Sequence, residues 1–479
     1  MIATLVILGA SGDLTSRFLM PALMRLHEAG QLPAGFRVVG LARDDWDTAM
    51  FRRHLEEKLG SSARQAVLAR TEYRPVDVTD PDQLAEVLGR ETQPVVAYLA
   101  LPPSLFRPTI ETMATCRLPR GSKLVVEKPF GTDLASACDL NRLLHESFPE
   151  QDVFRLDHFL GKQTVQNILG LRFANRVFEP LWNAQHIERV EIVWDETLTA
   201  AGRASFYDGT GALRDMIQNH LLQLLALVAM EPLHSLDART LRDRKVDVFR
   251  AVRRLASGEI DRHTVRGRYG HGAADGREVS PYVDEAGVDP GRKTETFAQV
   301  VLSIDNWRWA GVPFVLRTGK ALGRNRREMV VHFKPVPHVA FGQETQPPSN
   351  VLTIELAPDR IALSVNVNKP GDLFEMEQVA LDRSFGSEGL PAYARLLLDV
   401  LNGDPMLSIR DDEAEESWRI VEPILARWAE GGVPLLEYAA GTEGPPLLPS
   451  RGGLTAPAQD RQSLELITIR DHEAGTRQS

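Results

Sequence analysis

The turn Gly9–Leu14 has the residue types of a phosphate-binding loop. It reads Gly-Ala-Ser-Gly-Asp-Leu, directly follows the apolar run Thr4–Leu8 and opens a helical pattern. Gly9 permits a tight turn, and Gly12 lets the backbone approach a pyrophosphate, whose charge is favoured by exposed N–H groups and by the helix dipole. Because the complete G-x-G-x-x-G pattern is absent, the motif also fits an ordinary glycine-containing turn before a helix.

The next strand-like run indicates which dinucleotide the turn would hold. It reads Val-Val-Gly-Leu-Ala and ends on Arg43, where an NAD enzyme usually places the carboxylate that binds the ribose hydroxyls. An arginine at this position accommodates a 2′-phosphate, so the sequence favours NADP. Asp44 and Asp45 follow at once, and they leave NAD possible.

Three further segments concentrate titratable side chains. Glu127–Gly131 and Arg155–Lys162 each follow a strand-like run, and Gly211–His220 begins an apolar helical stretch. Imidazole, carboxylate and amine groups are those that move protons and bind anions in enzymes. Taken singly, each has an ordinary structural interpretation: Lys128 fits a solvated loop lysine, and His220 fits a hydrogen-bonded core histidine.

Together these segments resemble the glucose-6-phosphate dehydrogenase family. The resemblance runs from Gly9 to about Pro446 and includes the long stretches Gly161–Asn183 and Tyr207–Pro232. It implies a Rossmann domain followed by a domain with a large antiparallel sheet, with the active site between them. It also implies NADP-dependent oxidation of glucose 6-phosphate at C1 to 6-phosphogluconolactone, in the oxidative pentose phosphate pathway.

The resemblance further implies a role for individual residues. His220 corresponds to the general base that removes the hydroxyl proton while hydride passes to the nicotinamide, and Asp157 to the carboxylate that orients this histidine. No metal is expected. The residues expected to contact the cofactor are Gly9, Ser11, Gly12, Asp13, Leu14, Arg43, Tyr98 and Lys128. Those expected to contact the sugar phosphate are Lys128, His158, Lys162, Glu196, Asp215 and Lys320.

Several positions at this predicted site depart from the family pattern. Each hydrogen bond lost to a charged phosphate costs about 1.5–3 kcal/mol before compensation. The departures therefore leave two alternatives open, a related dehydrogenase for another sugar phosphate or sugar, and a non-catalytic sensor of NADP or sugar phosphate. The departing positions are Phe18 (usually Lys), Phe159 (usually Tyr), Asn325 (usually basic), Ala357 (usually Gln) and the run Thr197–Ala201 (usually Gly-rich).

The elements that must position these residues divide the chain. Short apolar runs alternate with helix-like stretches in the first third, a pattern typical of a parallel, doubly wound sheet. The predicted strands and helices are Thr4–Leu8, Leu19–Glu28, Arg37–Leu41, Asp82–Leu88, Val95–Leu101 and Lys123–Val126. We therefore predict an α/β Rossmann domain over residues 1–177.

Longer alternating runs follow, and they indicate an α+β domain with a large, mostly antiparallel sheet over residues 178–450. Residues Gly267–Arg292, rich in Gly and Asp, are predicted to form an irregular surface segment. The tail 451–479 is expected to be partly disordered. The predicted strands are Ile187–Trp194, Thr296–Ile304, Phe314–Arg317, Met329–Phe333, Val351–Leu356 and Ile361–Val367, and the predicted helices are Gly211–Met230 and Pro391–Leu401.

Composition limits the classes of partner. The 479 residues carry a net charge of −10, which argues against nonspecific binding to nucleic acid or to anionic membranes. The longest later apolar run, Leu221–Met230, is too short to span a bilayer. Cys116 and Cys138 are expected to be reduced thiols, so we expect a cytoplasmic protein. The family resemblance implies a homodimer or homotetramer.

Overall fold

The first sheet is parallel and carries the nucleotide turn. The computed structural model describes residues 1–446 apart from 61–63, 117, 340–345, 373–374 and 387–388. Six strands pair in the order β3-β2-β1-β4-β5-β6, which is the order of a doubly wound dinucleotide-binding domain. The strands are β1 Thr4–Leu8, β2 Arg37–Ala42, β3 Thr71–Pro75, β4 Val95–Leu99, β5 Lys123–Glu127 and β6 Val153–Leu156.

Helices return the chain between these strands. They are α1 Met20–Glu28, α2 Thr48–Leu59, α4 Pro81–Leu88, α5 Phe106–Thr115 and α6 Leu134–Ser147. Central strands β1 and β4 are buried along their whole length, as expected for a sheet covered on both faces. The predicted Rossmann domain is therefore confirmed.

The second sheet has nine strands in the order β16-β15-β14-β13-β7-β12-β11-β8-β17. Most neighbours are antiparallel, as predicted, whereas β7–β12 and β8–β17 pair in parallel. The strands are β7 Ile187–Asp195, β8 Thr264–Gly270, β11 Phe297–Ser303, β12 Pro313–Gly319, β13 Arg326–Phe333, β14 Val351–Leu356, β15 Asp359–Asn368, β16 Met376–Ser384 and β17 Leu435–Ala439.

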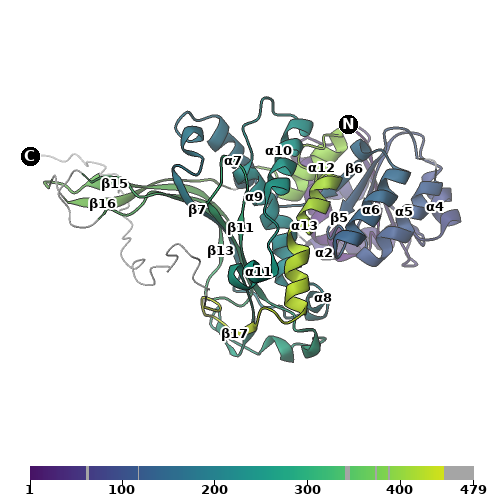
Figure 1. The fold of residues 1–479 in the computed structure, drawn as a ribbon. Helices are drawn as coiled ribbons and strands as arrows, with labels where there is room; N and C mark the ends of the chain where they lie inside the picture. Colours follow the sequence, from purple (N-terminus) through teal and green to yellow (C-terminus); the bar gives the residue numbers. More distant parts are fainter. Residues whose placement is uncertain (61–63, 117, 340–345, 373–374, 387–388, 447–479) are drawn as a thin grey trace, which may run out of the picture.

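A layer of helices stands between the two sheets (Figure 1). It contains the π-helical segment η6 Leu213–Leu221, which continues as α9 Leu222–Ala229, together with α7 Gln163–Phe173, α10 Ala238–Ala251, α12 Ala392–Asn402 and α13 Asp411–Ala429. One hydrophobic core runs through both sheets and this layer. Within the described part of the chain, no helix is long and apolar enough to cross a membrane.

The prediction of an irregular surface segment over Gly267–Arg292 is only partly correct, because the segment is largely exposed but also contains short strands and buried side chains. The segment contains the end of β8 and a small hairpin of β9 Gly272–Ala274 and β10 Arg277–Val279. Tyr269 and Tyr282 are buried in a second, smaller core. The burial of these two tyrosines fixes the segment against the rest of the domain, although Gly and Asp dominate the composition of the segment. The tail predicted over 451–479 lies outside the described residues.

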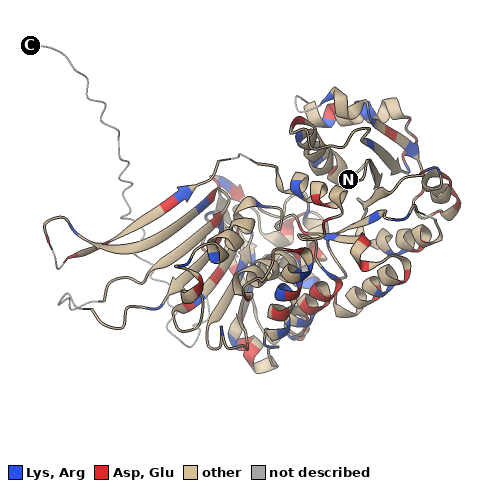
Figure 2. Cartoon of the chain, turned by 90° about the horizontal axis from the view of Figure 1, so that it is seen from above, with Lys and Arg blue, Asp and Glu red and all other residues tan. Residues whose placement is uncertain are grey.

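Basic side chains are spread over many helices and strands among acidic ones (Figure 2), and the clearest gathering of one sign is acidic, at Asp411, Asp412 and Glu413 in the first turn of α13. This distribution fits a surface without an extended basic face for nucleic acid. Local clusters of cations must therefore hold any phosphate that the protein binds.

Candidate active site

His220 and Asp157 meet where the two domains join. Asp157 directly follows β6 of the first sheet, and His220 lies on η6. Nδ1 of His220 is 2.6 Å from Oδ1 of Asp157, and both side chains are about 1% exposed. The same carboxylate oxygen accepts a hydrogen bond from the backbone N–H of Phe159, at 2.9 Å. The pair predicted from sequence is therefore in direct contact.

Burial and the neighbouring charges fix the protonation of this pair. Burial lowers the pKa of His220 below its ordinary value of 6.5, although the charge of Asp157 opposes the shift. For Asp157, burial favours the neutral acid, but the charge and hydrogen bond of His220 outweigh it and hold the carboxyl pKa well below its ordinary value. At neutral pH the ring is therefore uncharged, and with Nδ1 bound to Asp157 its Nε2 is the nitrogen left to accept a proton.

Aromatic rings surround the imidazole of His220. The ring of Phe159 stacks on it with a centroid distance of 3.9 Å, and the ring of His158 meets it edge-on at 4.9 Å. His158 also stacks on Tyr393 of α12, at 5.7 Å. Burial, followed by the charge of His220, lowers the pKa of His158 to about 3. His158 is therefore a neutral hydrogen-bonding group here, and a bound anion would raise its pKa.

Two ion pairs flank the histidine with residues from both domains. Nζ of Lys128, just after β5, lies 3.3 Å from Oδ1 of Asp215 on η6. Nζ of Lys320, just after β12, lies 2.9 Å from Oε2 of Glu196. Burial disfavours the charged carboxylate of Asp215, but Lys128 and then Lys320 outweigh it, so its pKa is lowered. These charged groups offer acceptors and donors to a polyhydroxylated ligand.

The nucleotide turn lies at the carboxyl end of β1. Gly9 has φ +90°, and a Cβ at this position would lie 2.3 Å from the carbonyl oxygen of Ala100, so only glycine fits. A Cβ at Gly12 would lie 3.3 Å from its nearest neighbour, the carbonyl oxygen of Gly9. Gly12 is exposed, and because it has no side chain it leaves the outer surface of the turn uncovered. Ser11 and Asp13 are not buried, and Leu14 is half-buried. This geometry fits a backbone cradle for a pyrophosphate.

The side chain of Arg43 is exposed, whereas the side chain of Tyr98 is buried. Arg43 follows β2 and is exposed, and no described carboxylate lies within ion-pair distance of it. Tyr98 on β4 is fully buried, and its hydroxyl donates to Oε1 of Glu127 at 2.5 Å. Any contact of Tyr98 with a cofactor must therefore come from its backbone, because its side chain points into the core.

Sequence reasoning missed three residues near the site. Burial raises the pKa of Glu127 to about 7, although the hydrogen bond from Tyr98 opposes the shift. Tyr393 reaches His158 from a helix more than 200 positions away, so no local pattern pointed to it. Trp194 lies on β7 two residues before Glu196, and its Nε1 donates to Oε1 of that residue at 3.2 Å.

A metal ion at this site would have to share ligand atoms with the histidine–aspartate hydrogen bond. Asp157, His158 and His220 each offer an atom within 4.8 Å of the others, a spacing compatible with a metal. The 2.6 Å hydrogen bond already uses Nδ1 of His220 and Oδ1 of Asp157. The arrangement thus suits proton transfer without a metal better than coordination.

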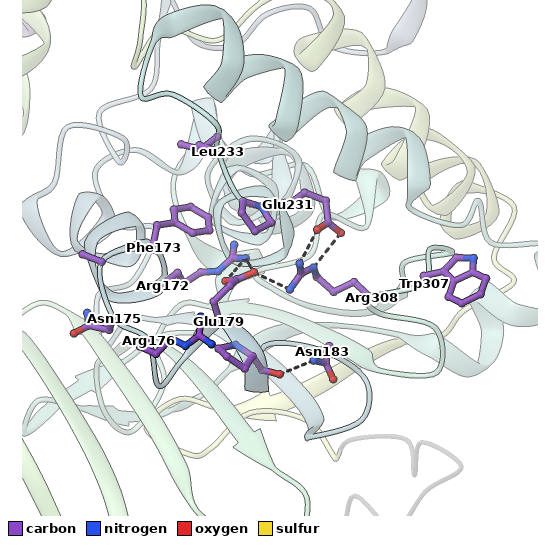
Figure 3. A pocket seen from close by; sticks show the side chains of 13 residues that line it. Arg172, Phe173, Asn175, Arg176, Glu179, Asn183, Glu231, Leu233, Trp307 and Arg308 are labelled. Atoms are coloured by element: carbon purple, nitrogen blue, oxygen red, sulfur yellow. Dashed lines mark hydrogen bonds and ion pairs between the residues drawn. The ribbon is translucent and has the colours of Figure 1, made fainter.

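An open pocket of about 830 Å³ lies elsewhere, beside the ends of α7 and α9 (Figure 3). Two of its arginines are paired with carboxylates: Arg308 contacts Glu231 at 2.6 Å and Glu179 at 2.9 Å, and Arg172 contacts Glu179 at 3.1 Å. None of the predicted site residues lines it. We therefore place the candidate active site at His220 and not in this pocket.

Comparisons with known proteins identify the family of the chain. Residues 6–167 match the family model described as the glucose-6-phosphate dehydrogenase NAD binding domain, and residues 169–449 match its C-terminal domain. Glucose-6-phosphate 1-dehydrogenase of Zymomonas mobilis is 41% identical, over 95% of this chain and 99% of that protein. The enzyme of the same name from Mycolicibacterium smegmatis is 42% identical, over 92% and 94%.

Solved structures give the same result. A structure described as glucose-6-phosphate dehydrogenase in complex with its substrate glucose-6-phosphate aligns with a TM-score of 0.85 and 32% identity, over 93% of this chain and 96% of that chain. An NAD binding oxidoreductase from Klebsiella pneumoniae, at 12% identity and a TM-score of 0.52, shares the fold alone. On the two family models and these relatives, the chain belongs to the glucose-6-phosphate dehydrogenase family.

Proposed function

We propose that this protein oxidises glucose 6-phosphate at C1 with NADP and releases 6-phosphogluconolactone. The observation that carries the proposal is the buried hydrogen bond between His220 and Asp157, which joins the nucleotide-binding domain to the sheet domain. Relatives that share about 41% of the sequence over nearly their whole length are named for this activity.

In this proposal, His220 is the general base. Its neutral Nε2 takes the proton of the C1 hydroxyl, and the charge that then forms on the ring is stabilised by Asp157 through Nδ1. Bound NADP supplies the hydride acceptor. Lys128, Asp215 and Glu196 orient the sugar by hydrogen bonds to its hydroxyl groups, which keeps C1 in line with the base.

We propose that Gly9–Leu14, Lys128 and Arg43 hold the cofactor. The two glycines leave room for a pyrophosphate to approach the turn, and the exposed guanidinium of Arg43, which has no described carboxylate within ion-pair distance, suits a 2′-phosphate. Arg43→Ala should therefore raise the KM for NADP much more than the KM for NAD. Equal effects on both cofactors would show that Arg43 has a general structural role.

The experiment that tests the proposed function is a panel of initial rates. Glucose 6-phosphate, glucose and other hexose 6-phosphates would each be assayed with NADP and with NAD. The proposal predicts the highest kcat/KM for glucose 6-phosphate with NADP. A higher value for another sugar would indicate the related dehydrogenase suggested by Phe159 and Asn325, and binding without turnover would indicate a sensor.

We also propose that residues 1–177 act as the cofactor domain and residues 178–450 as the domain for substrate and self-association. The family supports a homodimer or homotetramer in the cytoplasm. The outer strands of the large sheet fit this role, because β16 leaves one edge of the sheet unpaired among the described strands.

A further inference from the structure

The chain carries an unusual cluster of arginines after Lys320. Asn325 stands where a basic residue is usual, and Arg324, Arg326 and Arg327 surround it. Asn325 is engaged with the neighbouring turn: its Oδ1 accepts from the backbone N–H of Thr197 at 3.2 Å, and its Nδ2 donates to the hydroxyl of the same residue. These two hydrogen bonds therefore give Asn325 a structural role in holding the turn at Thr197.

Two of the three arginines pair with carboxylates outside the candidate active site. Arg326 donates from Nε and Nη2 to Oε1 of Glu328, at 3.0 and 2.8 Å. Arg324 is half exposed and lies 3.5 Å from Glu443. Since neighbouring side chains of a strand point to opposite faces, Arg327 leaves the sheet on the side opposite to Arg326. Arg327 alone of these arginines contacts residues of the active site.

Arg327 packs on the indole of Trp194, which pairs with it in the β13–β7 register. Its guanidinium carbon is 5.1 Å from the ring centroid. Nζ of Lys162 lies 5.4 Å from the centroid of the same indole and 5.6 Å from that of Phe159, which stacks on His220. One aromatic side chain thus brings two cations together beside the general base.

The two cations lack enough negative charge to neutralise them. Within the described residues, no carboxylate comes within ion-pair distance of Lys162, and burial lowers its pKa, with Arg327 lowering it further against the opposing charge of Asp359. Nη2 of Arg327 is 3.5 Å from Glu196, but that carboxylate already binds Lys320 at 2.9 Å. Nε of Arg327 is buried without a hydrogen-bond partner. A bound anion would offset the remaining positive charge of Lys162 and Arg327.

We propose that Arg327 binds the phosphate group of the substrate together with Lys162, and so replaces the cation that Asn325 does not supply. A guanidinium forms two parallel hydrogen bonds to a phosphate, which a single ammonium cannot do. The proposal rests on the proposed function, because it assigns the phosphate end of that substrate.

The test compares Arg327→Ala with Arg327→Lys and with Arg324→Ala, a matched control that removes a cation from the same segment. We expect Arg327→Ala to raise the KM for glucose 6-phosphate and the inhibition constant of inorganic phosphate roughly 10- to 100-fold. The kcat and the KM for NADP should stay within about threefold, since the base and the cofactor turn are untouched. Arg327→Lys should recover part of the loss, and Arg324→Ala should match the wild type.

Two outcomes separate failure of this inference from failure of the proposed function. If the wild type oxidises glucose 6-phosphate but Arg327→Ala keeps a wild-type KM and phosphate inhibition, Arg327 does not bind the phosphate. An equal loss of kcat/KM for glucose 6-phosphate and for free glucose would likewise overturn the assignment, because it would reveal only a structural role. Absence of glucose 6-phosphate turnover in the wild type would instead overturn the proposed function, and the inference with it.

Discussion

His220 and Asp157 lie 63 positions apart in the chain, and their 2.6 Å contact gives the site its capacity for proton transfer. The residue types alone did not predict this contact, because an imidazole on an apolar helix also fits a core position. The family resemblance predicted the contact, through the order and spacing of whole segments. It did not reveal that Phe159 would stack on the imidazole or that Arg327 would reach Trp194, since both depend on packing between strands and helices.

Replacing the base tests the first assignment. In His220→Asn the side chain can no longer take a proton, so kcat should fall at least about 100-fold, within the range that general base catalysis contributes. The KM for glucose 6-phosphate should change little. His271→Asn, which removes an exposed histidine paired with Glu278, is the control and should keep full activity. Near-normal turnover by His220→Asn would show that another group is the base.

The pH dependence of kcat/KM should report the same histidine. Because burial lowers the pKa of His220 below 6.5, the neutral base is fully present above that pH, and activity should fall only as the pH drops through the lowered value. In Asp157→Asn the charged ring loses its partner, so the acid limb should move to lower pH and the plateau should fall by about 10²–10⁴.

Profiles measured between about pH 5 and 9 test this prediction. The control is Glu127→Gln, since burial raises the pKa of Glu127 to about 7 and this group also titrates in the range. An acid limb that lies above pH 6.5 and survives Glu127→Gln would contradict the assignment of the limb to His220.

At the scale of elements, sequence periodicity predicted the regular strands well. The bounds of β1 and β14 agree with the predicted runs, whereas β3, β16 and β17 were missed because charged or exposed residues interrupt their apolar pattern. The run Gly211–Met230 was predicted as a helix, but its first part is π-helical. Apolar spacing does not distinguish these hydrogen-bond patterns, and π-helical turns are frequent at functional sites.

Helices α10 and α13 are joined by a buried ion pair that no pattern predicted. Nζ of Lys245 is 2.7 Å from Oε2 of Glu413, and both side chains are about 1% exposed or less. Lys245→Met should lower the free energy of unfolding by about 3–5 kcal/mol because it removes the cation paired with a buried carboxylate. The double variant Lys245→Met/Glu413→Leu should recover most of this loss. Urea unfolding measures both, and equal losses in the single and double variants would contradict this account.

At the scale of the whole molecule, the sheet domain extends away from the active site. Strands β15 and β16 project from the body on the side opposite the first sheet (Figure 1). Strand β16 is mostly exposed, and the side chain of Leu381 on it is 60% exposed. An open strand edge with an exposed apolar residue favours association with a second copy of the chain. The proposed catalytic residues, His220 and Asp157, come from one chain, so their contact does not depend on association.

Sedimentation velocity tests the proposed self-association. We expect the wild type to sediment as a multiple of the 53.2 kDa chain, and Leu381→Asp to shift the distribution towards the monomer. Phe206→Asp is the control, because this exposed phenylalanine lies on α8 (Ala204–Asp208), away from the sheet edge. A monomeric wild type, or equal dissociation in both variants, would argue against the edge of β16 as the interface.

The indole of Trp194, held against two cations, has an optical consequence. Trp182, Trp309 and Trp418 are fully buried and Trp307 is fully exposed, whereas Trp194 packs against Lys162 and Arg327, the two residues that we propose bind the substrate phosphate. Nearby positive charges perturb the excited state of an indole, so we expect its ultraviolet emission to change when a phosphate draws Lys162 and Arg327 toward itself. Titration with glucose 6-phosphate should give a saturable emission change that Trp194→Phe abolishes. Such a signal would report substrate occupancy in real time without any added dye.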